Sequence, residues 1–218
     1  MPIHLLKLVL LLPITGFSAA FGDEKAGEVG AGATEMPRRF ASIHFDVTKD
    51  ELRAMRKVSP VMTLKTNSPN VWVEPNLGGP YFQSALYGFD ERSATLAWVA
   101  FVGELPAKDA DGYRKRLVAD AITKWGRDYS VYRSSRQIRS QSEECITIVW
   151  KRPGAKVFLS LAANPTASTQ MIDLKLVKPQ IEQSDAIPDL GAPDFRVRDE
   201  LHRLLNDAKI AENIPKFE

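Results

Sequence analysis

The residues that could carry acid–base or nucleophilic chemistry are few and far apart in this chain of 218 residues. It has three histidines, His4, His44 and His202, and a single cysteine, Cys145. No H-E-x-x-H, C-x-x-C, G-x-S-x-G or Walker spacing occurs, so none of these catalytic or phosphate-binding motifs is present. A zinc site would need carboxylates from several elements. We therefore predict no metal site and no cofactor.

Three pairs of adjacent carboxylates are the remaining candidates for catalysis: Asp90-Glu91, Glu143-Glu144 and Asp199-Glu200. A hydrolase of the glycosidase type needs two carboxyl groups that face each other across a cleft. Positions in a turn or on the surface of an element explain these pairs without chemistry. We therefore assign no catalytic residue, and a secreted hydrolase that uses carboxylates remains an alternative.

A run of basic residues gives the sharpest signal for binding. Eight basic residues lie between Arg114 and Arg139, against two acidic ones. Three arginines recur at every third position with two tyrosines beside them: Arg133, Arg136, Arg139, Tyr129 and Tyr132. Such a cluster could bind an anionic partner, such as an acidic protein, a polysaccharide or a lipid head group. The competing interpretation is a solvated helix face followed by an exposed connector.

Aromatic residues around a Gly/Pro/Asn loop form a second candidate site. Trp72, Tyr81, Phe82 and Tyr87 surround the loop at residues 75–80. Aromatic side chains beside such a loop can bind a sugar or a peptide, although packing in the core is the competing interpretation. The candidate ligand-binding residues are therefore Arg133, Arg136, Arg139, Trp72 and Tyr81.

The first 22 residues are predicted to be a secretory signal peptide. A mostly apolar run from Leu8 to Phe17 is followed by the small residues Ser18, Ala19 and Ala20. Cleavage is expected near Ala20 or Gly22, with export to the periplasm or outside the cell. An uncleaved anchor is the alternative, but the run is shorter than the ~20 residues that span a membrane. We therefore expect no stable membrane span in the mature chain.

The composition is that of a globular protein without nucleic-acid character. It is 44% hydrophobic and 26% charged, and its 29 basic and 27 acidic residues leave a net charge of +2. This balance gives no reason to expect binding to nucleic acid. An intramolecular disulfide is impossible with one cysteine, so a hydrophobic core must hold the fold.

The pattern of apolar residues predicts an α+β fold with a mostly antiparallel sheet. One amphipathic helix is expected from Tyr113 to Trp125, ended by Gly126 and packed on a face of the sheet. A C-terminal amphipathic helix should begin after Asp194. The clearest strands are residues 144–151, 156–161 and 171–177, and residues 94–102 are apolar on both sides, as in a central strand. The predicted division is a signal peptide at 1–22, a flexible lead-in at 23–38, the α+β domain at 39–178, a linker at 179–194, and the C-terminal helix and tail at 195–218.

Three local predictions concern the margins of this domain. A short strand is expected over residues 42–47, where apolar and polar residues alternate. A helix should follow, begun by a capping box of Thr48 and Glu51 and burying Leu52 and Met55. The basic, Ser-rich segment at residues 127–140 is predicted to be a connector.

Export and the small number of reactive groups together favour a secreted, non-catalytic domain. It is expected to bind a protein or an anionic ligand at the cell envelope or outside the cell. The alternatives are the carboxylate hydrolase and a structural or assembly subunit that docks through its C-terminal helix. The oligomeric state and the identity of the partner stay open.

Overall fold

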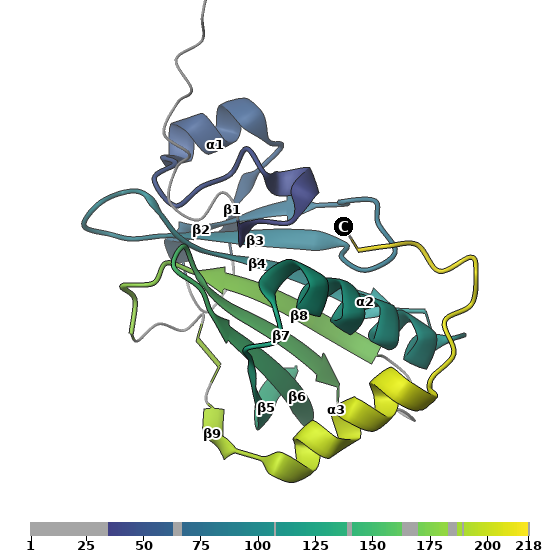
Figure 1. Ribbon diagram of the computed structural model, residues 1–218. Helices are drawn as coiled ribbons and strands as arrows, with labels where there is room; N and C mark the ends of the chain where they lie inside the picture. Colours follow the sequence, from purple (N-terminus) through teal and green to yellow (C-terminus); the bar gives the residue numbers. More distant parts are fainter. Residues whose placement is uncertain are drawn as a thin grey trace, which may run out of the picture.

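A single antiparallel sheet of nine strands organises the fold (Figure 1). This computed structural model describes residues 35–62, 67–106, 108–138, 141–162, 170–182, 187–188 and 190–217. The elements are α1 (Lys49–Met55), β1 (Ser59–Met62), β2 (Asn67–Pro75), β3 (Ser84–Phe89), β4 (Leu96–Leu105), α2 (Ala110–Trp125), β5 (Ser130–Ile138), β6 (Gln141–Lys151), β7 (Lys156–Ala162), β8 (Gln170–Val177), β9 (Leu190–Pro193) and α3 (Phe195–Asp207). The predicted α+β class, with a main helix and a C-terminal helix, is confirmed.

Two four-stranded meanders make up most of the sheet. The strand order is β1-β2-β3-β4-β8-β7-β6-β5-β9, so each meander consists of strands that follow one another in the chain. The second meander runs back toward the first, and the two meet where β8 pairs with β4. This junction extends from Trp98 opposite Val177 to Leu105 opposite Gln170.

The position of α2 follows from this strand order. Four successive antiparallel pairings separate β4 from β5, so these two strands run parallel to each other. Parallel strands cannot be joined by a tight turn and need a crossover connection. The 16-residue helix α2 provides it, lying across one face of the sheet (Figure 1). Gly126 ends α2 at φ +90°, as its predicted role as a C-terminal residue requires.

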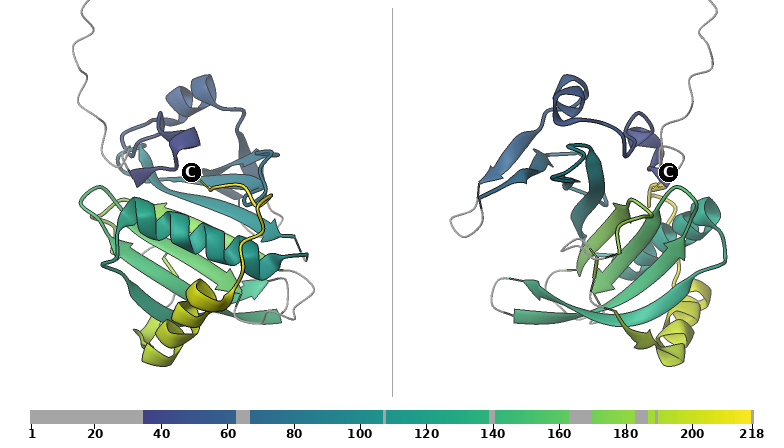
Figure 2. Two further views of the ribbon diagram at one scale, coloured as in Figure 1. Left: turned by 45° about the vertical axis from the view of Figure 1, so that its right-hand side comes forward. Right: turned by 90° about the vertical axis from the view of Figure 1, so that its left-hand side faces the viewer.

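The main core lies between this face of the sheet and the helices. On α2, Leu117, Val118 and Ala121 are fully buried. Trp125 at its end packs against Trp150 of β6, with 5.6 Å between ring centroids. Helix α3 and the C-terminal residues lie on the same side of the sheet as α2 (Figure 2). Because α2 and α3 both cover this face, the strands can present apolar residues to it along most of their length.

A smaller apolar cluster lies on the opposite face. Val149, Phe158 and Val177 are buried there, and Ile181 and Ile187, in the segment after β8, pack against them. Trp98 of β4 also joins this cluster, which explains why β4 is apolar on both sides. Beside the cluster, three buried hydroxyl groups form a row across β5, β6 and β7: Ser134 to Thr147 at 2.7 Å, and Thr147 to Ser160 at 2.8 Å.

The outermost strands of the sheet are both short and both contain proline. Strand β1 has four residues, including Pro60, and β9 has four, including Pro193. Proline lacks the N–H group that a further strand would need, so these residues weaken the two free edges as pairing sites. The range 179–194, predicted as a linker, contains β9.

Three local predictions differ from the structure. Residues 42–47 form turns and irregular backbone rather than a strand: Ile43 and Phe45 are buried, but the backbone contact with β4 is limited to the bond from the Leu96 N–H to the Val47 carbonyl and the bridge that follows it. The predicted connector at 127–140 contains β5, which pairs with β6. The prediction was wrong because the sequence of β5 is mostly polar and lacks the alternating apolar residues that indicate a strand. Met55 is 42% exposed rather than buried, although the capping box of Thr48 and Glu51 and the burial of Leu52 are confirmed.

The core assignment predicts large losses of stability on truncation. Leu117 and Ile148 are 0% exposed and lie on opposite sides of the helix–sheet interface. We expect Leu117→Ala or Ile148→Ala to lower the free energy of unfolding by about 2–5 kcal/mol, because each leaves a cavity. Met55→Ala is the control and should change it by less than ~0.5 kcal/mol. Urea denaturation would measure all three, and equal losses in the core and control variants would contradict this core.

Candidate functional site

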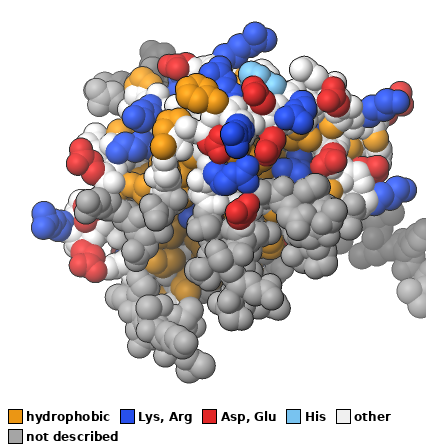
Figure 3. All heavy atoms as spheres, turned by 90° about the horizontal axis from the view of Figure 1, so that it is seen from below, with side chains coloured by type: hydrophobic (Ala, Val, Ile, Leu, Met, Phe, Trp, Pro, Cys, Tyr) orange, Lys and Arg blue, Asp and Glu red, His pale blue; other side chains and the backbone are white. Residues whose placement is uncertain are grey.

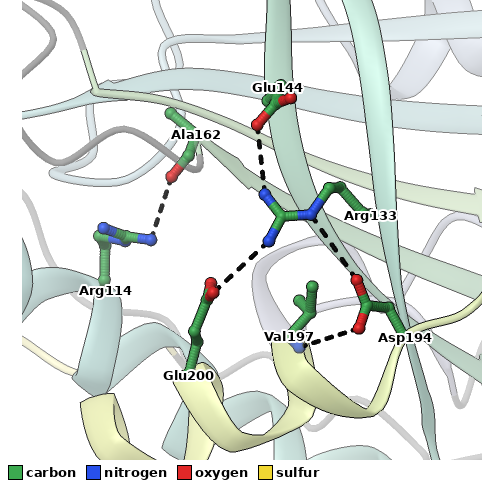
Figure 4. Close-up of polar contacts among 7 residues, drawn as sticks. All are labelled: Arg114, Arg133, Glu144, Ala162, Asp194, Val197 and Glu200. Atoms are coloured by element: carbon green, nitrogen blue, oxygen red, sulfur yellow. Dashed lines mark hydrogen bonds and ion pairs between the residues drawn. The ribbon is translucent and has the colours of Figure 1, made fainter.

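Arg133, the first candidate arginine, is surrounded by carboxylates. Its guanidinium group lies 3.2 Å from Glu144, 3.4 Å from Glu200 and 3.7 Å from Asp194 (Figure 4). These partners come from β6, from α3 and from the residue before α3. Asp194 also accepts hydrogen bonds from the backbone N–H groups of Arg196 and Val197 and so begins that helix. Arg133 therefore joins the edge of the sheet to α3.

This arrangement changes the electrostatics predicted for the basic cluster. One cation faces three anions, so the local charge around Arg133 is negative, which disfavours an anionic ligand at that point. Arg136 lies further along β5, opposite Glu143 in the strand register. Arg139 lies outside the described residues. Anion binding by these three arginines thus remains a prediction, and the surroundings of Arg133 do not favour it.

Arg114 of α2 is a buried cation with a structural contact. It is 6% exposed and donates a hydrogen bond to the Ala162 carbonyl at 3.0 Å (Figure 4). It also lies 3.5 Å from Asp111. Burial lowers the pKa of the Arg114 guanidinium, and the Asp111 charge partly offsets this effect. The contact fixes the first turn of α2 to the end of β7.

Trp72 lies beneath α1, in a layer of aromatic rings covered by cations. It is 8% exposed and packs edge-on against Phe89. Three basic residues spaced at i, i+4 and i+7 from the start of α1 each lie over one ring: Lys49 over Phe89 at 5.7 Å, Arg53 over Trp72 at 5.4 Å and Arg56 over Phe40 at 4.6 Å. A cation over an aromatic face is stabilised by the ring quadrupole. Helix α1 thus rests on the rest of the protein through charged as well as apolar side chains.

Arg56 also belongs to a buried polar network. It makes two contacts with the Glu74 carboxylate, at 2.8 and 2.9 Å, and Tyr87 donates its hydroxyl to the same carboxylate at 2.8 Å. Burial raises the pKa of Tyr87, and its bond to the anionic Glu74 raises it further. Burial opposes the charged form of Arg56, but the bonds to Glu74 outweigh this and its pKa is raised. Each charge of this network is therefore already balanced within the fold.

Tyr81, the other aromatic candidate, is covered by the end of the chain. It is 3% exposed and donates its hydroxyl to the Pro215 carbonyl at 2.8 Å. Its ring packs edge-on against Tyr113 and Phe217. Trp72 and Tyr81 are thus held in separate environments, under α1 and under residues 208–217, and neither ring is open to solvent in this conformation.

A small hollow lies elsewhere, beside β5 and β6. Its volume is about 120 Å³, and it is lined by Asp128, Tyr129, Ser130, Tyr132, Val149 and Lys151. Pockets for small molecules usually have roughly 300–1,000 Å³. The hollow is therefore too small to carry a functional assignment.

The other reactive groups are dispersed. His202 is exposed on α3, His44 is half-buried before α1, and Cys145 is buried in β6. Asp90 accepts bonds from Arg92 and Ser93 within its own turn. Among the residues that the structure describes, no group of three or more His, Cys, Asp or Glu side chains could hold a metal ion.

Comparisons with protein-family models, with curated proteins and with solved structures found no match for this chain. A functional argument therefore depends on the geometry of its own residues. The most unusual part of that geometry is the set of cations around α1, which the sequence analysis did not identify. The spacing of Lys49, Arg53 and Arg56 was a signal that could have revealed it.

The raised pKa of Tyr87 predicts that the protein loses stability at alkaline pH. A tyrosine whose pKa is higher in the folded state stabilises the fold fully below its unfolded pKa of about 10. That contribution is lost as the pH rises through the higher folded-state pKa, by up to about 1.4 kcal/mol per pH unit. Tyr87→Phe should therefore reduce the slope of unfolding free energy against pH above pH 10. Tyr132→Phe is the control, and equal slopes for Tyr87→Phe and the unaltered protein would contradict the prediction.

Proposed function

We propose that this protein is an exported, non-catalytic binding domain that holds an anionic partner on the surface around α1. The residues that would do so are Arg39, Arg53 and Lys57, here called the α1 cationic surface. All three side chains are exposed. In the part of the chain that the structure describes, none of the three forms an ion pair. This observation carries the proposal, since exposed cations without counter-ions attract anions most strongly.

The surroundings of these three residues strengthen the case. Residues 38–57 contain six basic side chains and three acidic ones, so the segment has a local excess of positive charge. Arg39 lies 5.9 Å from the centre of the Phe40 ring, and Arg53 lies over Trp72. Aromatic rings beneath the guanidinium groups reduce the number of orientations that binding must fix.

Met55 adds an apolar contact to the same helix. It is 42% exposed and lies two residues after Arg53 and two residues before Lys57. Methionine is flexible and polarisable, and it is common on surfaces that adapt to a partner. A partner with acidic groups around an apolar patch would fit this surface.

The contrast with α3 supports the choice of surface. At the lower end of the molecule, where α3 and β9 lie, basic and acidic side chains are interspersed (Figure 3). Most of the apolar stripe of α3, which motivated the assembly alternative, is used within the protein: Val197 and Leu201 are buried, and Leu204 and Leu205 pack on the core. Phe195, at the start of α3, is 77% exposed, so that alternative keeps the support of this one side chain. No helix within the described ranges is both long and apolar enough to cross a membrane.

The hydrolase alternative also gains no specific support. Glu144 is bound to Arg133, Asp90 is bound within its turn, and Glu74 is balanced by Arg56. Hydrolysis of the glycosidase type would need two carboxyl groups that face each other across a cleft, whereas these three are each held by a neighbouring cation or turn. Export remains part of the proposal because of the apolar run at residues 8–17 and the small residues after it.

The binding proposal predicts a loss of affinity for polyanions when the α1 cationic surface is neutralised. We expect Arg39→Gln/Arg53→Gln/Lys57→Gln to lower the affinity for heparin and for poly-glutamate at least about tenfold, at roughly 1 kcal/mol per basic residue. The affinity of the unaltered protein should fall as salt rises, because salt screens exposed charges. Titrations at 50 and 500 mM NaCl would measure both effects.

A matched control removes the same charge elsewhere. The variant Arg196→Gln/Arg198→Gln/Arg203→Gln replaces three exposed arginines of α3 and should keep most of the affinity. An equal loss in both variants would show that only net charge matters. Binding that does not respond to salt would also exclude the α1 cationic surface.

The export proposal predicts a shortened N-terminus. When the full chain is expressed in a secreting host, mass spectrometry of the mature protein should find a start at Phe21 or Asp23, the residues that follow the two expected cleavage sites. A chain that keeps residues 1–20 in the cytosolic fraction would overturn this part of the proposal.

A further inference from the structure

Residues 208–217, here called the C-terminal strap, pack along α2 against a set of residues that we call the groove: Tyr81, Phe82, Gly112, Asp120 and Trp125. The strap leaves α3 near the first turn of α2 and runs along that helix to the region of β3 and β4 (Figures 1 and 2). Its contacts follow the helix from one end to the other. Lys115 donates to the Ala208 carbonyl at 2.6 Å, Asp120 accepts from the Phe217 N–H at 2.8 Å, and the Trp125 ring lies 6.2 Å from that of Phe217.

The groove recognises the backbone of the strap as well as its side chains. Tyr81 donates to the Pro215 carbonyl, and Asp120 accepts from the N–H of Phe217 two residues further on. One donor and one acceptor at this spacing fix the direction and register of an extended peptide. Pro215 needs no partner for its nitrogen, so its backbone is satisfied by the Tyr81 hydroxyl alone.

Two side-chain positions determine what the groove accepts. Phe217 lies among three aromatic rings, 6.3 Å from Tyr81, 5.7 Å from Phe82 and 6.2 Å from Trp125. Ile214 is 3% exposed and lies against Gly112 of α2. A Cβ atom at residue 112 would stand 2.7 Å from the end of the Ile214 side chain and 2.9 Å from the Lys209 carbonyl. The absence of a side chain at Gly112 therefore makes room for the strap.

We propose that this groove is a peptide-binding site that accepts an extended segment of the pattern aliphatic-Pro-x-aromatic from another polypeptide, with the C-terminal strap as its occupant in cis. The residues that recognise the peptide are Tyr81, Phe82, Gly112, Asp120 and Trp125. None of them belongs to the α1 cationic surface, so this proposal does not depend on the proposed function.

The strap sets the affinity that a partner must have. A ligand tethered by a short flexible segment has an effective concentration on the order of millimolar. A peptide in trans competes against it, so its apparent affinity for the unaltered protein equals the intrinsic affinity multiplied by the fraction of time for which the groove is empty. Weakening the strap should expose the intrinsic affinity of the groove.

The test uses a synthetic peptide of residues 208–217 and the full chain carrying Ile214→Ala/Phe217→Ala. This variant keeps every groove residue and removes the two side chains that hold the strap. We expect fluorescence anisotropy of the labelled peptide to show saturable binding at one site, at least about tenfold tighter than to the unaltered protein. A peptide in which both residues are alanine should bind at least about tenfold more weakly, because it lacks both anchors.

Substitutions in the groove distinguish specific recognition of the peptide from non-specific adsorption. Adding Tyr81→Phe to the strap variant should weaken peptide binding about fivefold, since it removes only the hydroxyl that donates to the Pro215 carbonyl. Adding Tyr132→Phe, a tyrosine on β5 outside the groove, should leave the affinity unchanged. Adding Gly112→Ala should abolish binding, because its Cβ would overlap the Ile214 position.

A second measurement does not need the strap variant to fold. In the unaltered protein, 1 mM peptide should speed hydrogen exchange in residues 209–217 as the strap is displaced, while exchange in β6 and β7 stays the same. Unchanged exchange in the strap would overturn the proposal. The proposal would also be overturned by a folded strap variant that does not bind the peptide, or that binds the doubly alanine-substituted peptide equally well.

Discussion

The pairing of β4 with β8 is the interaction on which the rest of the structure depends. It joins two meanders that are otherwise local, and it closes a loop of chain that includes α2 and three strands. Because such closure costs conformational entropy before it gains contacts, it must be accompanied by burial on both faces. The sequence of β4 meets this requirement, with Val99 and Phe101 in the main core and Trp98 in the opposite cluster. Gly103 lets the chain at Tyr81 cross directly over the strand, since a Cβ there would overlap the Tyr81 carbonyl.

The distribution of charge follows from burial. Inside the fold, cations meet carboxylates, carbonyls or rings: Arg56 meets Glu74 and Phe40, and the buried Arg114 meets the Ala162 carbonyl and Asp111. Such pairing is required wherever water is excluded, because an isolated buried charge is costly. Arg39, Arg53 and Lys57 are exposed and need no partner for stability. Charge that the fold does not require is available for recognition, and this is the basis on which we propose the α1 cationic surface rather than the basic run between Arg114 and Arg139.

Local patterns predicted much of the fold, while the candidate sites depended on contacts between distant segments. The helix ending at Gly126, the capping box at Thr48 and the strands with alternating apolar residues all follow from short stretches of sequence. Strand β5 was missed because its pairing with β6, rather than its own apolar content, makes it a strand. Trp72 and Tyr81 were predicted as candidate binding residues. The side chains that cover them come from α1 and from the end of the chain: Arg53 is 19 residues from Trp72, and Pro215 is 134 residues from Tyr81. No local pattern contains such information, and the same holds for the three carboxylates around Arg133.

The two short proline-bearing edge strands limit how copies of this protein can associate. Cross-β fibrils and edge-to-edge ribbons grow when an unpaired strand accepts another strand through its backbone, and long flat edges are the usual nuclei. Here Pro60 and Pro193 each leave a gap in the outermost row of donors, and each flanking strand offers only four residues. The two outermost strands therefore offer little backbone for a further strand to pair with, and β5 extends beyond the part that β9 covers.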